Sequence, residues 1–253
     1  MAIPALQLKN VSVSFANECL LRDVNVSAQQ QECLVLVGPS GFGKSVILKL
    51  FAGIMPPTDG FVFVNGVDLH SIAEAERHQI LLRMGMLFQK NALFDSLTVG
   101  ENIAFPLRET TPLGKAEIEE RVNDFLEAVG LSHAKGLFPS EISGGMQKRL
   151  GIARALALHP DIVLYDDPTA GLDPITSRKI IDLIIGLKTK NKSTVVAVTN
   201  DMVRAFQMAD QLAMVVDHSL IITGDKNQTM NHPDPRVQQF VHGRLEGPLT
   251  AEA

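Results

Sequence analysis

The chain has 253 residues, of which 45% are hydrophobic and 20% are charged, with a formal net charge of −5 and a pI near 5.8. This length and composition fit one large globular domain or two small ones. The acidic balance argues against a nucleic-acid-binding protein, and no apolar run reaches the roughly 18 residues that a membrane-spanning helix needs. The N-terminus lacks secretory features and the two cysteines lack metal-ligand spacing, so we expect a cytosolic protein with reduced thiols.

Apolar runs alternate with helical stretches along the chain, which predicts an α/β fold with a mostly parallel sheet. Residues 7–15 alternate in period 2, which predicts an antiparallel β subdomain at the N-terminus. We expect a single domain over 1–253, with a helical subdomain over about 90–160 and a C-terminal extension over about 226–253. The predicted strands are 33–38, 161–166, 193–199 and the hairpin 212–217 with 219–224, and the predicted helices are 44–54, 115–130 and 147–159.

The segment GPSGFGKS (38–45) follows the first buried strand and begins the first helix. It matches G-x-x-x-x-G-K-[ST], in which the glycines let backbone N–H groups converge on phosphates at a helix N-terminus. Lys44 would then reach the β- and γ-phosphates, and the Ser45 hydroxyl would coordinate Mg²⁺. The alternative is a glycine-rich turn that carries an exposed lysine. We predict a nucleoside-triphosphate site.

Two adjacent carboxylates, Asp166 and Asp167, end the strand predicted over 161–166. An unpaired carboxylate at the end of a buried strand is expensive to desolvate, so a cation is expected there. In P-loop proteins an aspartate at this place holds Mg²⁺, and the following acid can orient and deprotonate the attacking water. We expect Mg²⁺ and Lys44 to supply the positive charge. For Asp167 the alternative is a helix-capping or loop residue before Pro168.

A second glycine-opened helix start lies at Ser143-Gly144-Gly145, ahead of a basic amphipathic helix. Exposed N–H groups at such a start favour an anion. A capped helix without a ligand is the alternative when this stretch is taken alone.

The order of these motifs resembles one family. The P-loop, Gln89, the SGG-x-Q stretch, the strand that ends at Asp166 and the GLDP segment (171–174) follow one another as in the nucleotide-binding subunits of ATP-binding-cassette (ABC) transporters. The resemblance covers Phe15 to about Gly224. It implies a P-loop NTPase of the ABC ATPase type that binds ATP and Mg²⁺ and hydrolyses ATP.

The resemblance also implies roles for single residues. Phe15 matches the aromatic residue that stacks on adenine, and Gln89 matches the glutamine that senses Mg²⁺ and the γ-phosphate and couples to the membrane subunit. Asp173 matches an acid at the interface of a dimer that sandwiches two ATP molecules. The implied ATP-binding residues are Phe15, Gly38, Pro39, Ser40, Gly41, Phe42, Gly43, Lys44, Ser45 and Val46. The implied metal residues are Ser45, Gln89 and Asp166; the catalytic ones are Asp167, Gln89 and Asn200; and those that contact the ATP of the opposite subunit are Ser143, Gly144, Gly145, Met146 and Gln147.

A finer resemblance is to the ATPases of Mla-type and other MCE-associated lipid transporters of bacterial envelopes. It rests on ISGGM with Met146, and on segments 87–109, 171–177 and 232–249. It implies phospholipid or a related lipid as cargo, and permease subunits and an MCE-type lipid-binding protein as partners, without nucleic acid. It places the chain on the cytoplasmic face of the inner membrane as a homodimer or heterodimer, and leaves a small regulatory subunit open.

Three positions depart from the family pattern. Val46 replaces a frequent threonine, for which we expect little effect. Asp167 replaces the usual catalytic glutamate and is shorter by one methylene, and Asn200 stands where the family has the switch histidine. Because misplacement by about 1 Å can cost on the order of 100-fold in rate, we expect slow hydrolysis and intact binding. The alternatives are a degenerate subunit with little turnover, an importer ATPase for another substrate, and a soluble ABC ATPase acting on DNA or ribosomes.

Overall fold

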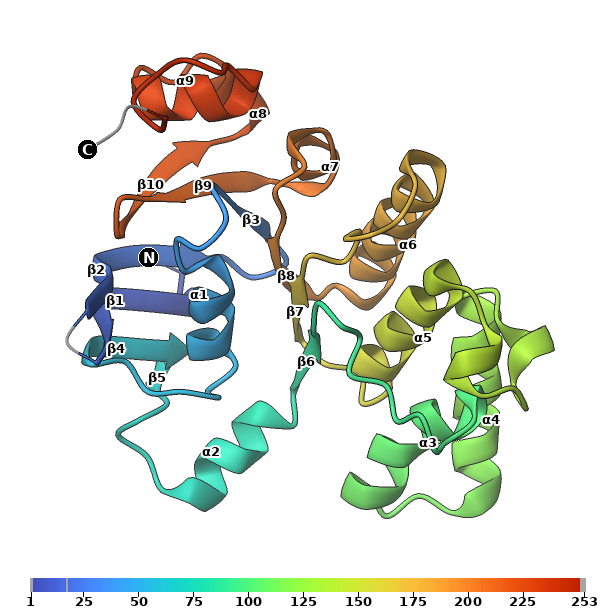
Figure 1. Ribbon diagram of the computed structural model, residues 1–253. Helices are drawn as coiled ribbons and strands as arrows, with labels where there is room; N and C mark the ends of the chain where they lie inside the picture. The colour runs from blue at the N-terminus through green and yellow to red at the C-terminus, as the bar shows by residue number, and fades with distance from the viewer. Residues whose placement is uncertain (1, 17, 251–253) are drawn as a thin grey trace. The chain divides into compact units, whose positions relative to one another are not determined.

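The computed structural model describes residues 2–16 and 18–250. The chain divides into two compact units, here called unit 1 (residues 1–77 and 194–253) and unit 2 (residues 78–193). The strands and helices of both units are labelled in Figure 1. The boundary between residues 77 and 78 falls inside the helix α2 (Glu74–Leu81).

Unit 1 contains an antiparallel sheet of strand order β2-β1-β4-β5. The strand β1 (Leu6–Phe15) pairs with β2 (Glu18–Ala28) and β4 (Asp59–Val64), and β4 also pairs with the short β5 (Val67–Asp68). Burial along β1 follows the alternation of its sequence, because successive side chains point to opposite faces of a strand. The antiparallel subdomain predicted near the N-terminus is confirmed.

A second group of strands in unit 1 carries the parallel pairing. The strand β3 (Cys33–Val37) lies between β8 (Thr194–Val198) and β9 (Gln211–Val216) and is parallel to both, and β10 (Ser219–Gly224) is antiparallel to β9. All residues of β3 and β8 are buried, as is typical of central strands in a parallel sheet. The helices of unit 1 are α1 (Lys44–Phe51), α7 (Met202–Met208), α8 (Lys226–Met230) and α9 (Pro235–His242).

The C-terminal segment of unit 1 is ordered by polar contacts. Arg236 on α9 forms ion pairs with Asp234 and with Asp217, which lies in the turn between β9 and β10. Hydrogen bonds from Arg236 lower the pKa of the Asp234 carboxyl to about 2. The buried Gln239 accepts a hydrogen bond from the Leu249 amide at 2.7 Å, which folds the end of the chain back onto α9.

Unit 2 contains one parallel strand pair and most of the helical structure. The strand β6 (Met84–Leu87) runs parallel to β7 (Ile162–Asp166). In α4 the buried residues recur at helical spacing and form one apolar face. The helices of unit 2 are α3 (Val99–Thr110), α4 (Lys115–Ala128), α5 (Gly144–Leu156) and α6 (Pro174–Asn191), with short 3₁₀ turns at Ser132–Ala134 and Pro139–Glu141.

The predicted strands and helices are all present, with differences at helix ends. The helix predicted over 147–159 begins earlier, at Gly144, because Ser143 caps it, and it ends at Leu156. The helix predicted to reach residue 54 ends at Phe51, shortly before Gly53 with its φ of 62°. Among residues 2–16 and 18–250, no helix combines the length and the apolar character needed to cross a membrane.

Candidate functional site

The loop between β3 and α1 has the backbone geometry that the phosphate-binding motif predicts. Gly38, Gly41 and Gly43 have φ angles of 134°, 88° and 96°, in the region that favours glycine. A Cβ at Gly38 would lie 2.2 Å from the carbonyl oxygen of Val215 on β9, so no larger residue fits there. The first turn of α1 carries no acidic residue, so its N–H groups and positive dipole end favour an anion.

Lys44 is positioned by the loop that it follows. Its side chain is buried, and Nζ donates hydrogen bonds to the carbonyl oxygens of Gly38 at 2.8 Å and Pro39 at 2.7 Å. The alternative of a glycine-rich turn with an exposed lysine is therefore wrong. Val46 lies in the first turn of α1, where its amide donates to the carbonyl oxygen of Gly43 at 3.0 Å.

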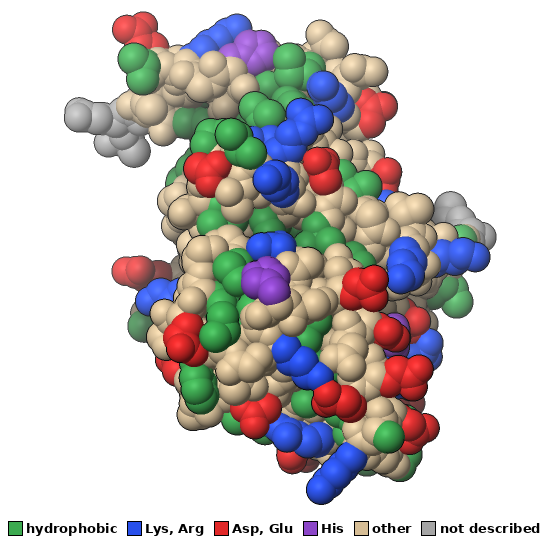
Figure 2. All heavy atoms as spheres, turned by 90° about the vertical axis from the view of Figure 1, so that its right-hand side faces the viewer, with side chains coloured by type: hydrophobic (Ala, Val, Ile, Leu, Met, Phe, Trp, Pro, Cys, Tyr) green, Lys and Arg blue, Asp and Glu red, His purple; other side chains and the backbone are tan. Residues whose placement is uncertain are grey.

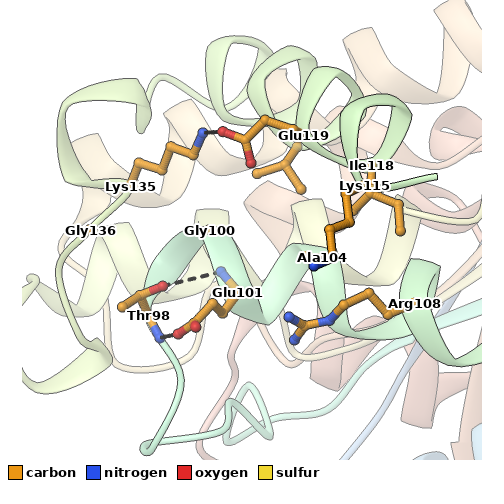
Figure 3. A pocket seen from close by; sticks show the side chains of 11 residues that line it. Thr98, Gly100, Glu101, Ala104, Arg108, Lys115, Ile118, Glu119, Lys135 and Gly136 are labelled. Atoms are coloured by element: carbon orange, nitrogen blue, oxygen red, sulfur yellow. Dashed lines mark hydrogen bonds and ion pairs between the residues drawn. The ribbon is translucent and has the colours of Figure 1, made fainter.

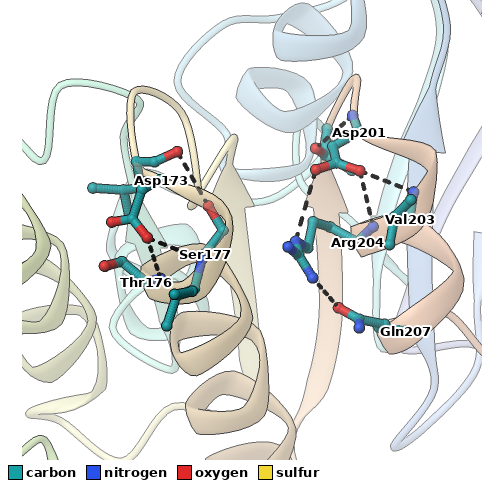
Figure 4. A network of polar contacts seen from close by, with 10 residues as sticks. Asp173, Thr176, Ser177, Asp201, Val203, Arg204 and Gln207 are labelled. Atoms are coloured by element: carbon teal, nitrogen blue, oxygen red, sulfur yellow. Dashed lines mark hydrogen bonds and ion pairs between the residues drawn. The ribbon is translucent and has the colours of Figure 1, made fainter.

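Two other predicted residues of unit 1 have informative positions. Asn200 follows β8, and its Nδ2 donates to the Ser40 hydroxyl at 3.2 Å, so the residue at the switch-histidine position touches the phosphate loop. Asp201 then caps α7 by accepting amide hydrogen bonds from Val203 and Arg204 (Figure 4). Phe15 ends β1 with 51% of its surface exposed, which leaves a ring face accessible for stacking.

The two acids predicted at the end of β7 differ in environment. Asp166 is the last of five consecutive buried residues, whereas Asp167 is half-buried. The backbone of Asp167 has a φ of 47°, a conformation that Asp adopts more readily than most other side chains. Asp173 is the N-cap of α6 and accepts from the amides of Ile175 and Thr176. Asp167 therefore does not cap α6, and the alternative that it is only a loop residue before Pro168 stays open.

A buried lysine of unit 2 lies beside these acids. Lys148 is on α5 and is 4% exposed, and its Nζ donates to the carbonyl oxygen of Gln89 at 2.7 Å and approaches that of Asp167 at 3.4 Å. Burial lowers the pKa of the Lys148 ammonium, and the Asp167 and Asp166 carboxylates oppose this shift. Lys148 thus brings a positive charge near the two acids within unit 2, and we did not predict this residue from the sequence.

The segment from Gln89 to Thr98 is held by further side chains of unit 2. Arg154 on α5 donates to the carbonyl oxygen of Ala92 at 2.6 Å and lies 5.2 Å from the centre of the Phe94 ring. The fully buried Asn102 on α3 bonds both the amide and the carbonyl of Phe94 and the carbonyls of two later residues of the segment. Gln89 itself is exposed at the start of this held segment.

The signature stretch and the GLDP segment line one cavity of about 480 Å³ in unit 2. Ser143 caps α5 by accepting a hydrogen bond from the Met146 amide at 3.3 Å. A Cβ at Gly145 would lie 2.8 Å from the Thr176 methyl group, so glycine permits the close approach of α5 and α6. Hydrogen bonds from Thr176 hold the pKa of the Asp173 carboxyl below its usual value (Figure 4). The helix is therefore capped, and it also faces a cavity.

Residues 21–170 match the family model described as ABC transporter. The chain belongs to the ABC transporter family of ATP-binding proteins. Its fold is that of an ABC-type P-loop NTPase, as predicted, and it is an ATPase of this type.

Two named relatives match nearly the whole chain. The intermembrane phospholipid transport system ATP-binding protein MlaF of Escherichia coli (strain K12) is 35% identical over 96% of this chain and 91% of its own length. The probable ribonucleotide transport ATP-binding protein mkl of Mycobacterium leprae (strain TN) is 38% identical over 97% of this chain and 71% of its own length.

Solved ABC cassettes share the fold. The dimeric ATP-binding cassette MJ0796, in a post-hydrolysis state bound to ADP and Pi, is 31% identical with a TM-score of 0.77 and covers 85% of this chain and 96% of its own. The cassette cbiO1 from Clostridium perfringens has a TM-score of 0.83 at 24% identity and covers 96% of both chains, which supports the fold alone.

The residues present fit magnesium held largely by a nucleotide. Among residues 2–16 and 18–250, no three His, Cys, Asp or Glu side chains form a metal-binding group. Mg²⁺ is typically bound by one or two protein oxygens together with water and substrate phosphates, rather than by an all-protein cage. Asp166 offers a carboxylate and Ser45 a hydroxyl, which are oxygen donors of the required kind.

Sequence reasoning missed Lys148, Arg154 and Asn102, which order the Gln89 segment and the end of β7. The sequence carries only a weak signal for Lys148. Helical periodicity places this basic residue, in the second turn of α5, on the buried side of the helix. The neighbouring sequence does not indicate which carbonyl groups such a residue contacts.

Proposed function

We propose that this chain is the ATPase subunit of a bacterial ABC transporter that moves phospholipid or a related lipid across or between envelope membranes. The observation that supports a lipid cargo is the match to MlaF over 96% of the chain. A match of that length includes most of the C-terminal extension, which lies outside the family core at 21–170. The match to a relative named for ribonucleotide transport is the reason to test the cargo directly.

Each unit contributes a distinct task to ATP hydrolysis in this proposal. The phosphate loop of unit 1 binds the β- and γ-phosphates through its N–H groups and Lys44, and Phe15 stacks on adenine. Asn200 contributes a neutral amide that is already bonded to Ser40. In unit 2, Asp166 is the ligand for Mg²⁺, which neutralises charge on the phosphates when it is bound. Asp167 orients water and accepts its proton.

The second proposed task of unit 2 is to complete the site of an opposite subunit. The cavity at Ser143 and Asp173 combines the N-terminus of α5 with a glycine-rich surface, features that favour phosphate binding. The dimeric state of the similar cassette MJ0796 supports this arrangement. We propose a homodimer, with a heterodimer as the alternative.

The membrane partner is proposed to contact the surface from Gln89 to Pro106. Within unit 2, a cavity of about 560 Å³ lies between α3 and α4 (Figure 3). Its lining combines the apolar residues Ala104, Ile118 and Val122 with charged groups such as the ion pair of Lys135 with Glu119. A lining that is both apolar and charged suits a short amphipathic segment of a permease. An MCE-type lipid-binding protein and a location on the cytoplasmic face of the inner membrane belong to the same proposal.

Two other functions are weighed against this one. A degenerate subunit would bind ATP and dimerise but barely turn over, because Asp167 is short and Asn200 carries no charge. An ATPase acting on DNA or ribosomes is disfavoured by the net charge of −5. On the face shown in Figure 2, acidic and basic side chains are interspersed rather than gathered into one basic stripe.

The test uses the chain together with its own membrane subunits in proteoliposomes. We expect ATP-dependent movement of a fluorescent phospholipid and stimulation of ATP hydrolysis by that lipid. ATP hydrolysis without any lipid movement, together with ATP-dependent uptake of a labelled ribonucleotide, would overturn the lipid assignment. Nucleotide binding and dimerisation without turnover would establish the degenerate subunit instead.

A further inference from the structure

Lys148 occupies a place that the ATP-binding motifs do not account for. It follows the signature residues on α5 and is 4% exposed. Burying an ammonium group is unfavourable unless hydrogen bonds and opposite charges compensate for its lost hydration. The compensation comes from the Gln89 carbonyl at 2.7 Å, the Asp167 carbonyl at 3.4 Å and the carboxylates of Asp166 and Asp167.

Lys148 and its partners belong to three separate segments of unit 2. Gln89 begins the segment that follows β6, Asp166 and Asp167 end β7, and Lys148 itself belongs to the signature helix. An ammonium group has three donors on a flexible stem and can bond two carbonyl groups while facing a carboxylate. An apolar side chain of similar length, such as that of methionine, donates no hydrogen bond to the carbonyl groups and brings no charge to the two acids.

We propose that Lys148 is a positioning residue for ATP hydrolysis, which holds the Gln89 segment and the Asp166–Asp167 pair in a fixed arrangement relative to the signature helix. It acts through Gln89 and Asp167, whose carbonyl oxygens it contacts. The inference rests on the proposed roles of these two residues. It also explains why two adjacent acids are tolerated at the end of a buried strand before any nucleotide binds.

The experiment compares Lys148→Met, which keeps the stem and removes the ammonium, with Lys148→Arg, which keeps the charge. Arg83→Met is the matched control, because Arg83 pairs with Asp161 beside the opposite ends of the same two strands. Circular dichroism and thermal melting first establish that each variant is folded. If Lys148→Met does not fold, Lys148→Gln takes its place, since it keeps a neutral donor.

Without nucleotide, hydrogen exchange should accelerate at the amides of residues 88–92, 167, 169 and 170 in Lys148→Met and remain at the wild-type rate in Arg83→Met. With the membrane subunits, Lys148→Met should lower kcat on the order of 10-fold to 100-fold, the range expected for a misplaced reacting group. The Kd for a fluorescent ATP analogue should change less than twofold, and Lys148→Arg should recover most of the turnover. In a Gln89→Ala background the same substitution should cost less, because both changes then act on one segment.

Wild-type kcat in folded Lys148→Met would overturn the inference and leave the proposed function intact. An equal loss of kcat in Arg83→Met, or a loss of ATP binding in Lys148→Met, would also overturn it, since either result indicates general destabilisation. A wild-type protein that neither binds nor hydrolyses ATP would instead overturn the proposed function itself.

Discussion

The phosphate loop of unit 1 and the end of β7 in unit 2 handle buried charge in opposite ways. In the loop, Lys44 bonds carbonyl oxygens only five and six residues away, so one short segment contains both the cation and its partners. At β7 the acids face Lys148, which reaches the carbonyl of Asp167 from 19 residues away in sequence. The first arrangement is encoded locally, whereas the second depends on how α5 packs against its neighbours. In the proposed function, nucleotide binding therefore relies on a locally encoded loop, and hydrolysis relies on side chains that tertiary structure brings together.

The largest effect is expected on ATP turnover when the acid Asp167, which follows β7, is changed. Asp167→Asn removes the proposed base, so turnover should fall at least about 100-fold, as is common when general-base catalysis is lost. ATP should bind at least as tightly, because repulsion between the carboxylate and the γ-phosphate is removed. Steady-state hydrolysis, nucleotide titration and size-exclusion chromatography measure turnover, affinity and a trapped closed dimer. Loss of ATP binding would instead make Asp167 a metal ligand and reverse the roles of the two acids.

On the loop side, Lys44→Ala should lower ATP affinity about 10-fold or more, because it removes the charge that faces the β- and γ-phosphates. The matched control is Lys49→Ala, an exposed lysine on the same helix α1. Fluorescent-nucleotide titration measures both. Equal losses in the two variants would show that net charge, and not the loop geometry, determines binding.

A smaller effect is expected from repairing the two departures from the family pattern. Asp167→Glu extends the acid, and Asn200→His restores a second contact to the phosphate, so the double substitution should raise turnover by more than the product of the single effects. The φ of 47° at Asp167 works against this gain, because Glu enters that conformation less readily than Asp.

ATP hydrolysis by wild type, the two single variants and the double variant, each in complex with the membrane partner, decides this question. A slower Asp167→Glu enzyme would show that the backbone has adapted to the shorter acid. Asp167 would then be a working variant of the site and not an impairment.

The C-terminal segment 232–249 is part of neither the phosphate loop nor the end of β7, so we expect its loss to affect assembly and not ATP binding. Truncation after Met230 should weaken the dimer or the transporter complex about tenfold, or about 1.4 kcal/mol, while leaving the MgATP affinity of the monomer unchanged. Truncation after Thr250 is the control, since it keeps the contacts of Gln239. Unchanged assembly of the shorter chain on size-exclusion chromatography would sink this prediction.

The smallest expected effect concerns the attachment of that segment through Asp234. Its pKa lies at about 2 in the folded protein, below the ordinary value of 3.8, so its contribution to stability is present above about pH 4 and is lost as the pH falls toward 2. The protection factors of the α9 amides, which compare exchange with the intrinsic rate at the same pH, should therefore fall more between pH 5 and pH 3 in wild type than in Asp234→Asn. Equal falls in the two proteins would show that this ion pair does not hold the segment.

Much of the fold could be predicted because its signals are local. A few consecutive residues are enough to predict the buried strands β3, β7 and β8 and the glycine-rich starts of α1 and α5. The ends of helices were predicted less accurately. The helix α5 begins at Gly144 and not at residue 147, because Ser143 caps it before the amphipathic pattern begins. The division into a single ATPase domain with a helical subdomain over about 90–160 stays a prediction.

The candidate site divides in the same way. The loop residues could be predicted because their spacing specifies a glycine-rich turn before a helix. Phe15 is exposed and Asn200 lies beside Ser40, and their roles toward the nucleotide stay predictions. Lys148 and Asn102 were missed because a lysine or an asparagine within a helix is usually solvated. Their partners are carbonyl groups, which every residue carries and no sequence pattern distinguishes.

The helix α5 carries three functional features of unit 2 along its length. It spans 13 residues, or roughly 20 Å, with the signature at its first turn, Lys148 in its second and Arg154 in its last. A helix of this length is mechanically stiff, so it transmits a push along its axis with little bending. In the proposed function, a force that the membrane partner applies near Ala92 and Phe94 would reach the signature stretch through α5 alone, because Arg154 of this helix contacts both residues.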